Sequence, residues 1–71
     1  MNAREMEFTV FCIENVATKL DITGNEAYLR LAVYSNILDE YIVPHYDVLH
    51  TQGKDYIVED IVDYMKECGV A

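Results

Sequence analysis

The sequence predicts an all-α fold, a compact small bundle of four main helices with an extra short turn of helix, in a single helical domain spanning residues 1–71. Apolar residues recur every three to four positions through most of the chain, which is the period of an amphipathic helix. Capping and breaking residues divide this pattern into segments of helical length. A hydrophobic content of 52% is enough for a packed core.

The first predicted helix runs from Glu5 to Leu20. Its apolar stripe consists of Met6, Val10, Ile13, Ala17 and Leu20, with Val16 beside them. Phe8 and Phe11 do not lie on this stripe but together on another side of the helix. Either later segments fold over these two rings, or the rings form an exposed aromatic patch that a partner covers.

The second predicted helix runs from Gly24 to Tyr34. Thr23 and Glu26 have the spacing of a capping box at its beginning. The residues expected to face inward are Ala27, Tyr28, Leu31, and Ala32 or Tyr34. Either Ser35 or Asn36 can cap a short third helix, which is predicted from Ile37 to Val43.

Pro44 ends the third helix, because proline lacks an amide hydrogen and disfavours helical geometry at the residue before it. The segment His45–His50 is then predicted to make one more turn, with Tyr46 and Leu49 pointing inward. Thr51–Lys54 is predicted as a loop, in which Gly53 is expected to adopt a left-handed backbone conformation.

The last predicted helix begins at Asp55 or Tyr56 and ends at Glu67. Its inward face is formed by five apolar residues: Ile57, Val58, Ile61, Val62 and Met65. Gly69 is placed to cap the end of this helix. The segment Tyr56–Val58 also has strand propensity, but the helical period continues past it.

The net charge of −8, with thirteen acids and five bases, is the strongest global signal. The bases are scattered, so nothing supports binding to a nucleic-acid backbone or to an anionic membrane. An acidic surface favours solubility or docking onto a basic protein. We expect a cytoplasmic protein with two free thiols: Cys12 in the core, and Cys68 more exposed at a helix end.

His45, Asp47 and His50 carry the types of side chain that bind metals, but histidines five residues apart do not share a helix face. We therefore expect no metal site, no cofactor and no catalytic residue. His50 is instead predicted to be a partly buried structural residue whose ring nitrogens bond backbone groups at the following turn. In this interpretation Thr51 caps the turn and Gln52 bridges the loop to a helix.

The segment from Asp39 to Ile61 resembles a family of short bacterial proteins of unknown function. The family has the signature Y-D-x-L-H-T-Q-G-x-x-Y-x-V-x-D-I, which this chain matches at Tyr46, Leu49, His50, Thr51, Gln52, Gly53 and Tyr56, among others. The resemblance brings no established activity with it. The resemblance implies that members are encoded at times beside ADP-ribosyltransferase-like proteins, and hence an accessory or toxin–antidote role.

The leading functional prediction is a non-enzymatic protein–protein interaction module. Its partner would be another protein or a second copy of the chain, and its anchors would be aromatic residues: Phe8, Phe11, Tyr41 and Tyr64. A nucleic-acid-associated regulator of helix-turn-helix type is the alternative prediction. A small metal-dependent enzyme is the third.

Overall fold

Six helical segments joined by short turns make up the computed structural model, which describes all 71 residues. They are α1 (Ala3–Leu20), α2 (Gly24–Tyr28), η1 (Leu29–Val33), η2 (Leu38–Ile42), α3 (Tyr46–Leu49) and α4 (Lys54–Glu67). The structure has no strand, so the all-α prediction is confirmed, and Tyr56–Val58 is helical. The predicted count of four main helices fits only loosely, because η2 and α3 have five and four residues.

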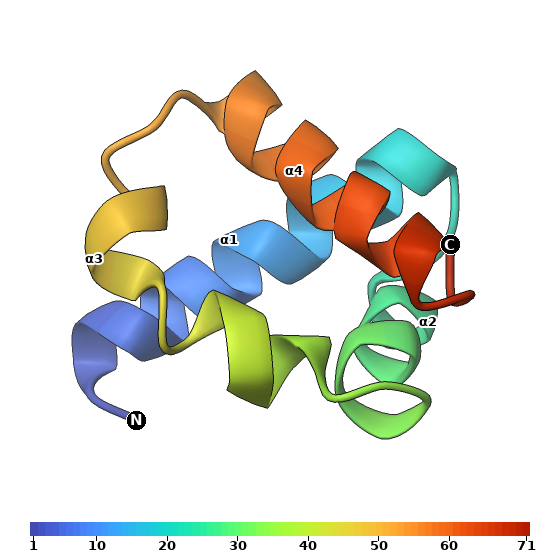
Figure 1. The fold of residues 1–71 in the computed structure, drawn as a ribbon, viewed down its shortest axis with the longest axis horizontal. Helices are drawn as coiled ribbons and strands as arrows, with labels where there is room; N and C mark the ends of the chain where they lie inside the picture. The colour runs from blue at the N-terminus through green and yellow to red at the C-terminus, as the bar shows by residue number, and fades with distance from the viewer.

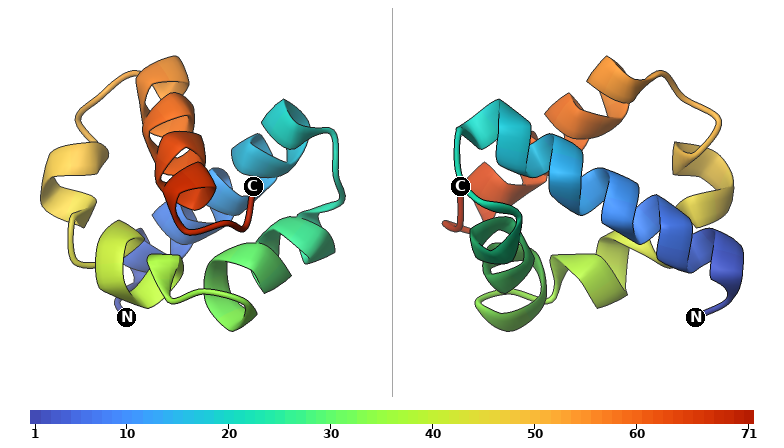
Figure 2. Two further views of the ribbon diagram at one scale, coloured as in Figure 1. Left: turned by 45° about the vertical axis from the view of Figure 1, so that its right-hand side comes forward. Right: turned by 180° about the vertical axis from the view of Figure 1, so that it is seen from behind.

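The two long helices, α1 and α4, cross each other (Figure 1). The segments from α2 to α3 lead from the end of α1 around one side of this pair and back to the beginning of α1 (Figure 2). This path places α3 beside the first turns of α1, although the two lie far apart in the sequence. None of the helices has both the length and the apolar character needed to span a membrane.

Every helical segment contributes to one hydrophobic core of fifteen buried residues. The predicted inward face of α4 is confirmed, since Ile57, Val58, Ile61, Val62 and Met65 are all buried. Leu49 on α3 is also buried, as predicted, while Tyr46 packs against the core and remains partly exposed.

The buried face of α1 differs from the predicted stripe. Its buried residues are Phe8, Thr9, Cys12, Val16 and Ala17, whereas Met6 and Val10 are 53% and 46% exposed. The stripe packs against the core only at its C-terminal end, through Ile13, Ala17 and Leu20. Because other segments cover the opposite side of the helix, Phe8 is 9% exposed and belongs to the core.

The second helix begins as predicted, with the Thr23 hydroxyl oxygen accepting a hydrogen bond from the Glu26 amide at 3.1 Å. The reciprocal bond of a capping box is missing there, because Glu26 Oε1 pairs with Arg30 Nε at 3.1 Å. A complete capping box forms instead at the beginning of α1. There Asn2 Oδ1 accepts from the Glu5 amide at 2.8 Å, and Glu5 accepts from the Asn2 amide at 3.0 Å.

Tyr28 and Tyr34 face outward, contrary to the expectation for the second helix, and are 46% and 60% exposed. The helix changes after Tyr28 to the π-helix η1, in which the Tyr34 amide donates to the Leu29 carbonyl at 2.8 Å. A π-helical turn holds more residues than the 3.6 of an α-helix, so the inward side shifts relative to a regular pattern. Leu31 is the fully buried residue of this segment.

The prediction of a left-handed Gly53 is wrong. Gly53 is the N-cap residue of α4 and has an extended backbone conformation, with φ −69° and ψ 156°. No side chain makes a capping hydrogen bond there. Left-handed conformations occur instead at Gly69, with φ 74°, and at Asp21, with φ 56°. Gly69 caps the end of α4 as predicted: the Val70 amide donates to the Met65 carbonyl at 2.9 Å, and the Gly69 amide to the Lys66 carbonyl at 3.1 Å.

Serine at these two glycine positions should have opposite effects on stability. Gly53→Ser should raise the free energy of unfolding by about 0.5–1 kcal/mol, because serine is a good N-cap and restricts the unfolded chain. Gly69→Ser should lower it by about 1 kcal/mol, because a side chain is strained at positive φ. Urea unfolding of both variants beside the wild type checks the prediction, and a loss of stability in both would contradict the N-cap assignment.

The two cysteines should differ strongly in reactivity. Cys12 is fully buried and Cys68 is exposed, as predicted, and neither forms a disulfide. Burial raises the pKa of the Cys12 thiol to about 12, so the reactive thiolate is scarce at neutral pH. An aromatic disulfide reagent should react rapidly with Cys68 and release one equivalent of aromatic thiol per chain. A second equivalent, from Cys12, should appear only when the protein unfolds. Rapid modification of both thiols would contradict the packing of α1.

Candidate interaction surface

A groove of about 420 Å³ opens between the beginning of α1 and the segment that follows Pro44. We call it the aromatic groove, and its lining is Arg4, Glu7, Phe8, Phe11, Tyr46, His50, Gln52 and Ile57. The two other hollows on the surface have volumes of about 320 and 240 Å³, and each has only one hydrophobic lining residue. The aromatic groove is therefore the hollow best suited to an apolar group.

Four aromatic rings follow one another along the aromatic groove. Phe11 lies nearly parallel to Phe8, with ring centroids 6.1 Å apart, and Phe8 meets Tyr46 edge to face at 5.4 Å. Tyr46 in turn stacks on His50 at 4.3 Å and an interplanar angle of 3°. Such contacts hold rings in a fixed arrangement, so the wall of the groove is formed before any partner arrives.

His50 is exposed, which contradicts the prediction that it is partly buried. Its Nδ1 atom lies 2.6 Å from the Tyr46 carbonyl oxygen, one turn back along the chain, rather than bonding the turn that follows. Because a carbonyl only accepts hydrogen bonds, Nδ1 is the donor, and Nε2 is the ring nitrogen that has no partner within the chain. The wall of the groove thus includes one ring nitrogen that is available for a hydrogen bond with an occupant.

The remaining signature residues shape the groove or the core beneath it. Leu49 is buried in the core, and Gly53 begins α4. The Thr51 hydroxyl donates to the Val48 carbonyl at 2.7 Å and so holds the turn before α4. Gln52 reaches the groove opposite α1, while Tyr56 lies outside it and is 59% exposed.

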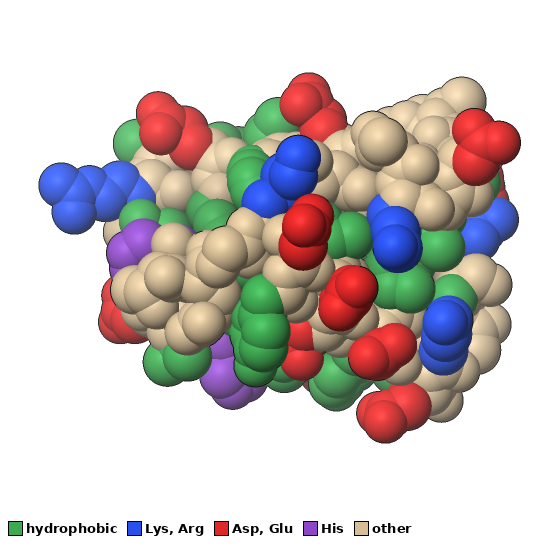
Figure 3. Space-filling view, turned by 90° about the horizontal axis from the view of Figure 1, so that it is seen from above, with side chains coloured by type: hydrophobic (Ala, Val, Ile, Leu, Met, Phe, Trp, Pro, Cys, Tyr) green, Lys and Arg blue, Asp and Glu red, His purple; other side chains and the backbone are tan.

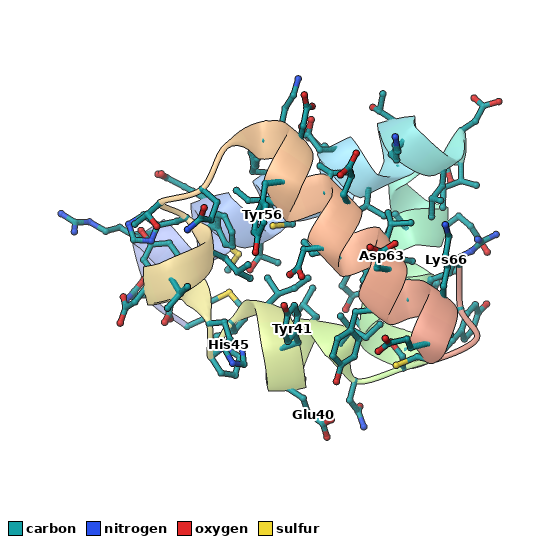
Figure 4. All side chains as sticks on the ribbon, turned by 45° about the horizontal axis from the view of Figure 1, so that its top comes forward. Glu40, Tyr41, His45, Tyr56, Asp63 and Lys66 are labelled. Carbon is teal, nitrogen blue, oxygen red and sulfur yellow. The ribbon has the colours of Figure 1, made fainter.

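A second group of aromatic rings, with one carboxylate beside them, comes from η2, from the turn after it and from α4. We call this group the tyrosine face, and its residues are Tyr41, His45, Tyr56, Asp60 and Tyr64. The Tyr41 ring has Tyr64 at a centroid distance of 4.6 Å and His45 at 4.9 Å. The Tyr41 hydroxyl donates a hydrogen bond to Asp60 Oδ2. Figure 4 shows Tyr41 and His45 on the side of the molecule where η2 faces α4, with Tyr56 near the beginning of α4.

The two histidines repeat one local arrangement. His45 Nδ1 lies 2.7 Å from the Tyr41 carbonyl oxygen, just as His50 Nδ1 lies close to that of Tyr46. The spacing Tyr-x-x-x-His, present twice between Tyr41 and His50, is the sequence signal for this arrangement. Arg4, Glu7 and Asp60 were not among the candidate site residues predicted from the sequence. The structure brings no three metal-binding side chains close enough together to hold an ion.

Tyr41 should make stability fall at high pH. Its hydrogen bond to Asp60, together with burial and the negative charge of Asp60, raises the pKa of Tyr41 to about 12. The stabilisation is therefore fully present below about pH 10, the unfolded pKa, and is lost as the pH rises through about 12. In urea unfolding at increasing alkaline pH, Tyr41→Phe should lose less stability than the wild type. Equal losses would contradict the hydrogen bond.

The aromatic anchors predicted from the sequence thus divide between two surfaces. Phe11 lines the aromatic groove, with Phe8 forming its floor as a core residue, while Tyr41 and Tyr64 belong to the tyrosine face. No curated protein matches the chain, and neither does any solved structure. A family model described as "Protein of unknown function (DUF3791)" matches residues 7–68, a range that includes most of both surfaces. The chain belongs to this family.

Proposed function

We propose that the chain is a non-enzymatic protein–protein interaction module whose aromatic groove receives an apolar side chain of a partner protein. The observation that supports this most is the pre-formed wall of four rings, in which Phe11 and Tyr46 are only half-buried. Aromatic residues in a hollow with a polar rim are the usual centre of a protein interface. Arg4 and Glu7 supply that rim here.

A binding role suits the groove better than a catalytic one. The lining contains no serine, threonine or cysteine that could act as a nucleophile. Its histidine is exposed, and the Nδ1 atom of that histidine faces a backbone carbonyl rather than a carboxylate that would support acid–base catalysis. What remains is an apolar wall with a polar rim, and these are the parts of a recognition site.

The charge of the chain favours a basic partner over a second copy. The net charge is −8, and Arg30 and Glu26 form the only ion pair, so twelve of the thirteen acidic side chains have no ion-pair partner within the molecule. Two identical chains would repel each other, whereas a basic protein would be attracted and would associate faster at low salt. The same charge opposes the helix-turn-helix alternative, since phosphates would be repelled as well.

The family resemblance supplies a candidate partner, namely a protein encoded beside the chain, with this chain in an accessory or antidote role. The test is calorimetric titration of the purified neighbouring protein with this chain. We expect saturable binding with a Kd of about 1 µM or lower, weakening as salt rises. Absence of heat with the neighbour, together with salt-sensitive binding to duplex DNA, would contradict the proposal and favour the nucleic-acid alternative.

A further inference from the structure

The tyrosine face differs from the aromatic groove in shape and charge, and no surface hollow lies over it. Tyr56, Asp60 and Tyr64 follow one another at intervals of four residues along α4, so they share one side of that helix. Tyr41 reaches this side from η2 and is fixed there by its stack on Tyr64 and its bond to Asp60. The result is a cluster of rings packed against one another beside a carboxylate.

Negative charge is concentrated on the two helices that carry most of these rings. The helices η2 and α4 together carry seven acidic residues and two lysines, and none of them forms an ion pair within the chain. In Figure 3 the acidic side chains on the visible face run in a row toward one edge of the molecule. On α4, Asp55, Glu59, Asp63 and Glu67 recur every four residues, so they repel one another along one side of that helix. An occupant with positive charge would relieve that repulsion.

The chemistry of the face distinguishes between kinds of positive charge. The Tyr41 hydroxyl donates a hydrogen bond to Asp60 Oδ2 and so orients the carboxylate. The Oδ1 atom of Asp60 makes no hydrogen bond within the chain. Tyrosine rings attract a cation placed over their faces, and the planar guanidinium group of arginine also stacks on them. Arginine can therefore contact a ring and donate to a carboxylate at once, whereas the compact ammonium group of lysine stacks poorly.

We infer that the tyrosine face binds an arginine-bearing segment of a partner protein, with the guanidinium group stacked on Tyr64 or Tyr56 and hydrogen-bonded to Asp60. This assignment rests on the stacked rings and the uncompensated acids of η2 and α4. It is independent of what occupies the aromatic groove. The two surfaces would bind different groups of a partner: the groove an apolar side chain, and the tyrosine face a positive charge.

The test is a nuclear magnetic resonance titration of the intact chain with two short peptides that are identical except for arginine or lysine. The arginine peptide should shift the signals of Tyr41, His45, Asp60 and Tyr64 in a saturable way. It should bind roughly fivefold more tightly than the lysine peptide, and this ratio should persist at about 0.5 M salt, where plain charge attraction is screened.

Matched variants separate the rings from the charge. Tyr64→Leu should weaken the arginine peptide roughly fivefold, while Tyr64→Phe, which keeps the ring, should bind like the wild type. Tyr34→Leu is the control, because Tyr34 is 60% exposed and lies outside the tyrosine face. Tyr56→Leu replaces Tyr64→Leu if that variant does not fold, since Tyr56 is 59% exposed.

Three results would overturn the inference. The first is equal affinity for the arginine and lysine peptides, with signals shifting evenly at all acidic residues, which would show only general charge attraction. The second is a shift of signals at Phe11 and His50 in place of the tyrosine face, which would move the cation to the aromatic groove. The third is no saturable shift with either peptide.

Discussion

The Phe11→Ser variant is expected to bind the partner protein about 30-fold more weakly than the wild type, because removing an aromatic anchor from the centre of an interface costs about 2 kcal/mol or more. Phe11 is only half-buried and stands at one end of the row of rings in the aromatic groove. Its truncation should therefore leave the fold intact. Calorimetric titration gives the affinity, and thermal unfolding followed by circular dichroism verifies the fold.

Val10→Ser is the matched control for this prediction. Val10 is the neighbouring residue on α1, is 46% exposed and does not line the groove. It presents an apolar side chain to solvent much as Phe11 does, but on another side of the helix. Its replacement should leave the affinity within about twofold of the wild type. If both variants lose affinity equally, the binding surface is the outer side of α1 and not the aromatic groove.

Ile61→Ala should lower the free energy of unfolding by about 2–4 kcal/mol, through lost burial and the cavity left behind. Ile61 is fully buried in the middle of α4. A chain of 71 residues buries a modest core, so this loss is a large fraction of its total stability. Urea unfolding monitored by circular dichroism measures the change.

The corresponding surface truncation is Val48→Ala. Val48 is also a β-branched aliphatic residue, but it is 63% exposed on α3. Its replacement should change the free energy of unfolding by no more than about 0.5 kcal/mol. A loss at Val48 as large as the loss at Ile61 would mean that α3 packs differently from the arrangement described here.

Local patterns predicted the parts of the fold that depend on a single helix. The period of α4 identified all five of its buried residues, and the capping signals at Thr23 and Gly69 placed the ends of two helices. These predictions succeeded because helix periodicity and end caps are determined by residues only a few positions apart.

The predictions that failed depend on tertiary contacts or on irregular backbone. Both sides of α1 are apolar, and which side is buried depends on where α3 and α4 pack. The stripe read from the sequence therefore overestimated the burial of Met6 and Val10. The π-helical turn η1 shifted Tyr34 outward, and the sequence period does not reveal such a turn. His50 was predicted to be partly buried with its ring nitrogens bonded to the following turn, but its stack on Tyr46 is made at the surface.

The candidate site was predictable in its parts but not in its assembly. The sequence singled out Phe8 and Phe11 at one end of the chain and Tyr46, His50 and Gln52 in the middle. That these form one groove follows only from the path of α2 to α3 around the helix pair, which returns the middle of the chain to the beginning of α1 (Figures 1 and 2). The same applies to Asp60, whose partner Tyr41 lies nineteen residues earlier.

Hydrogen–deuterium exchange of the chain, free and saturated with the protein encoded beside it, tests the central claim most directly. If the aromatic groove is the docking surface, protection on binding should be concentrated in two segments, residues 4–11 and 46–52, which hold seven of the eight lining residues. Protection confined to α2 and η1, with both of these segments unchanged, would contradict the claim.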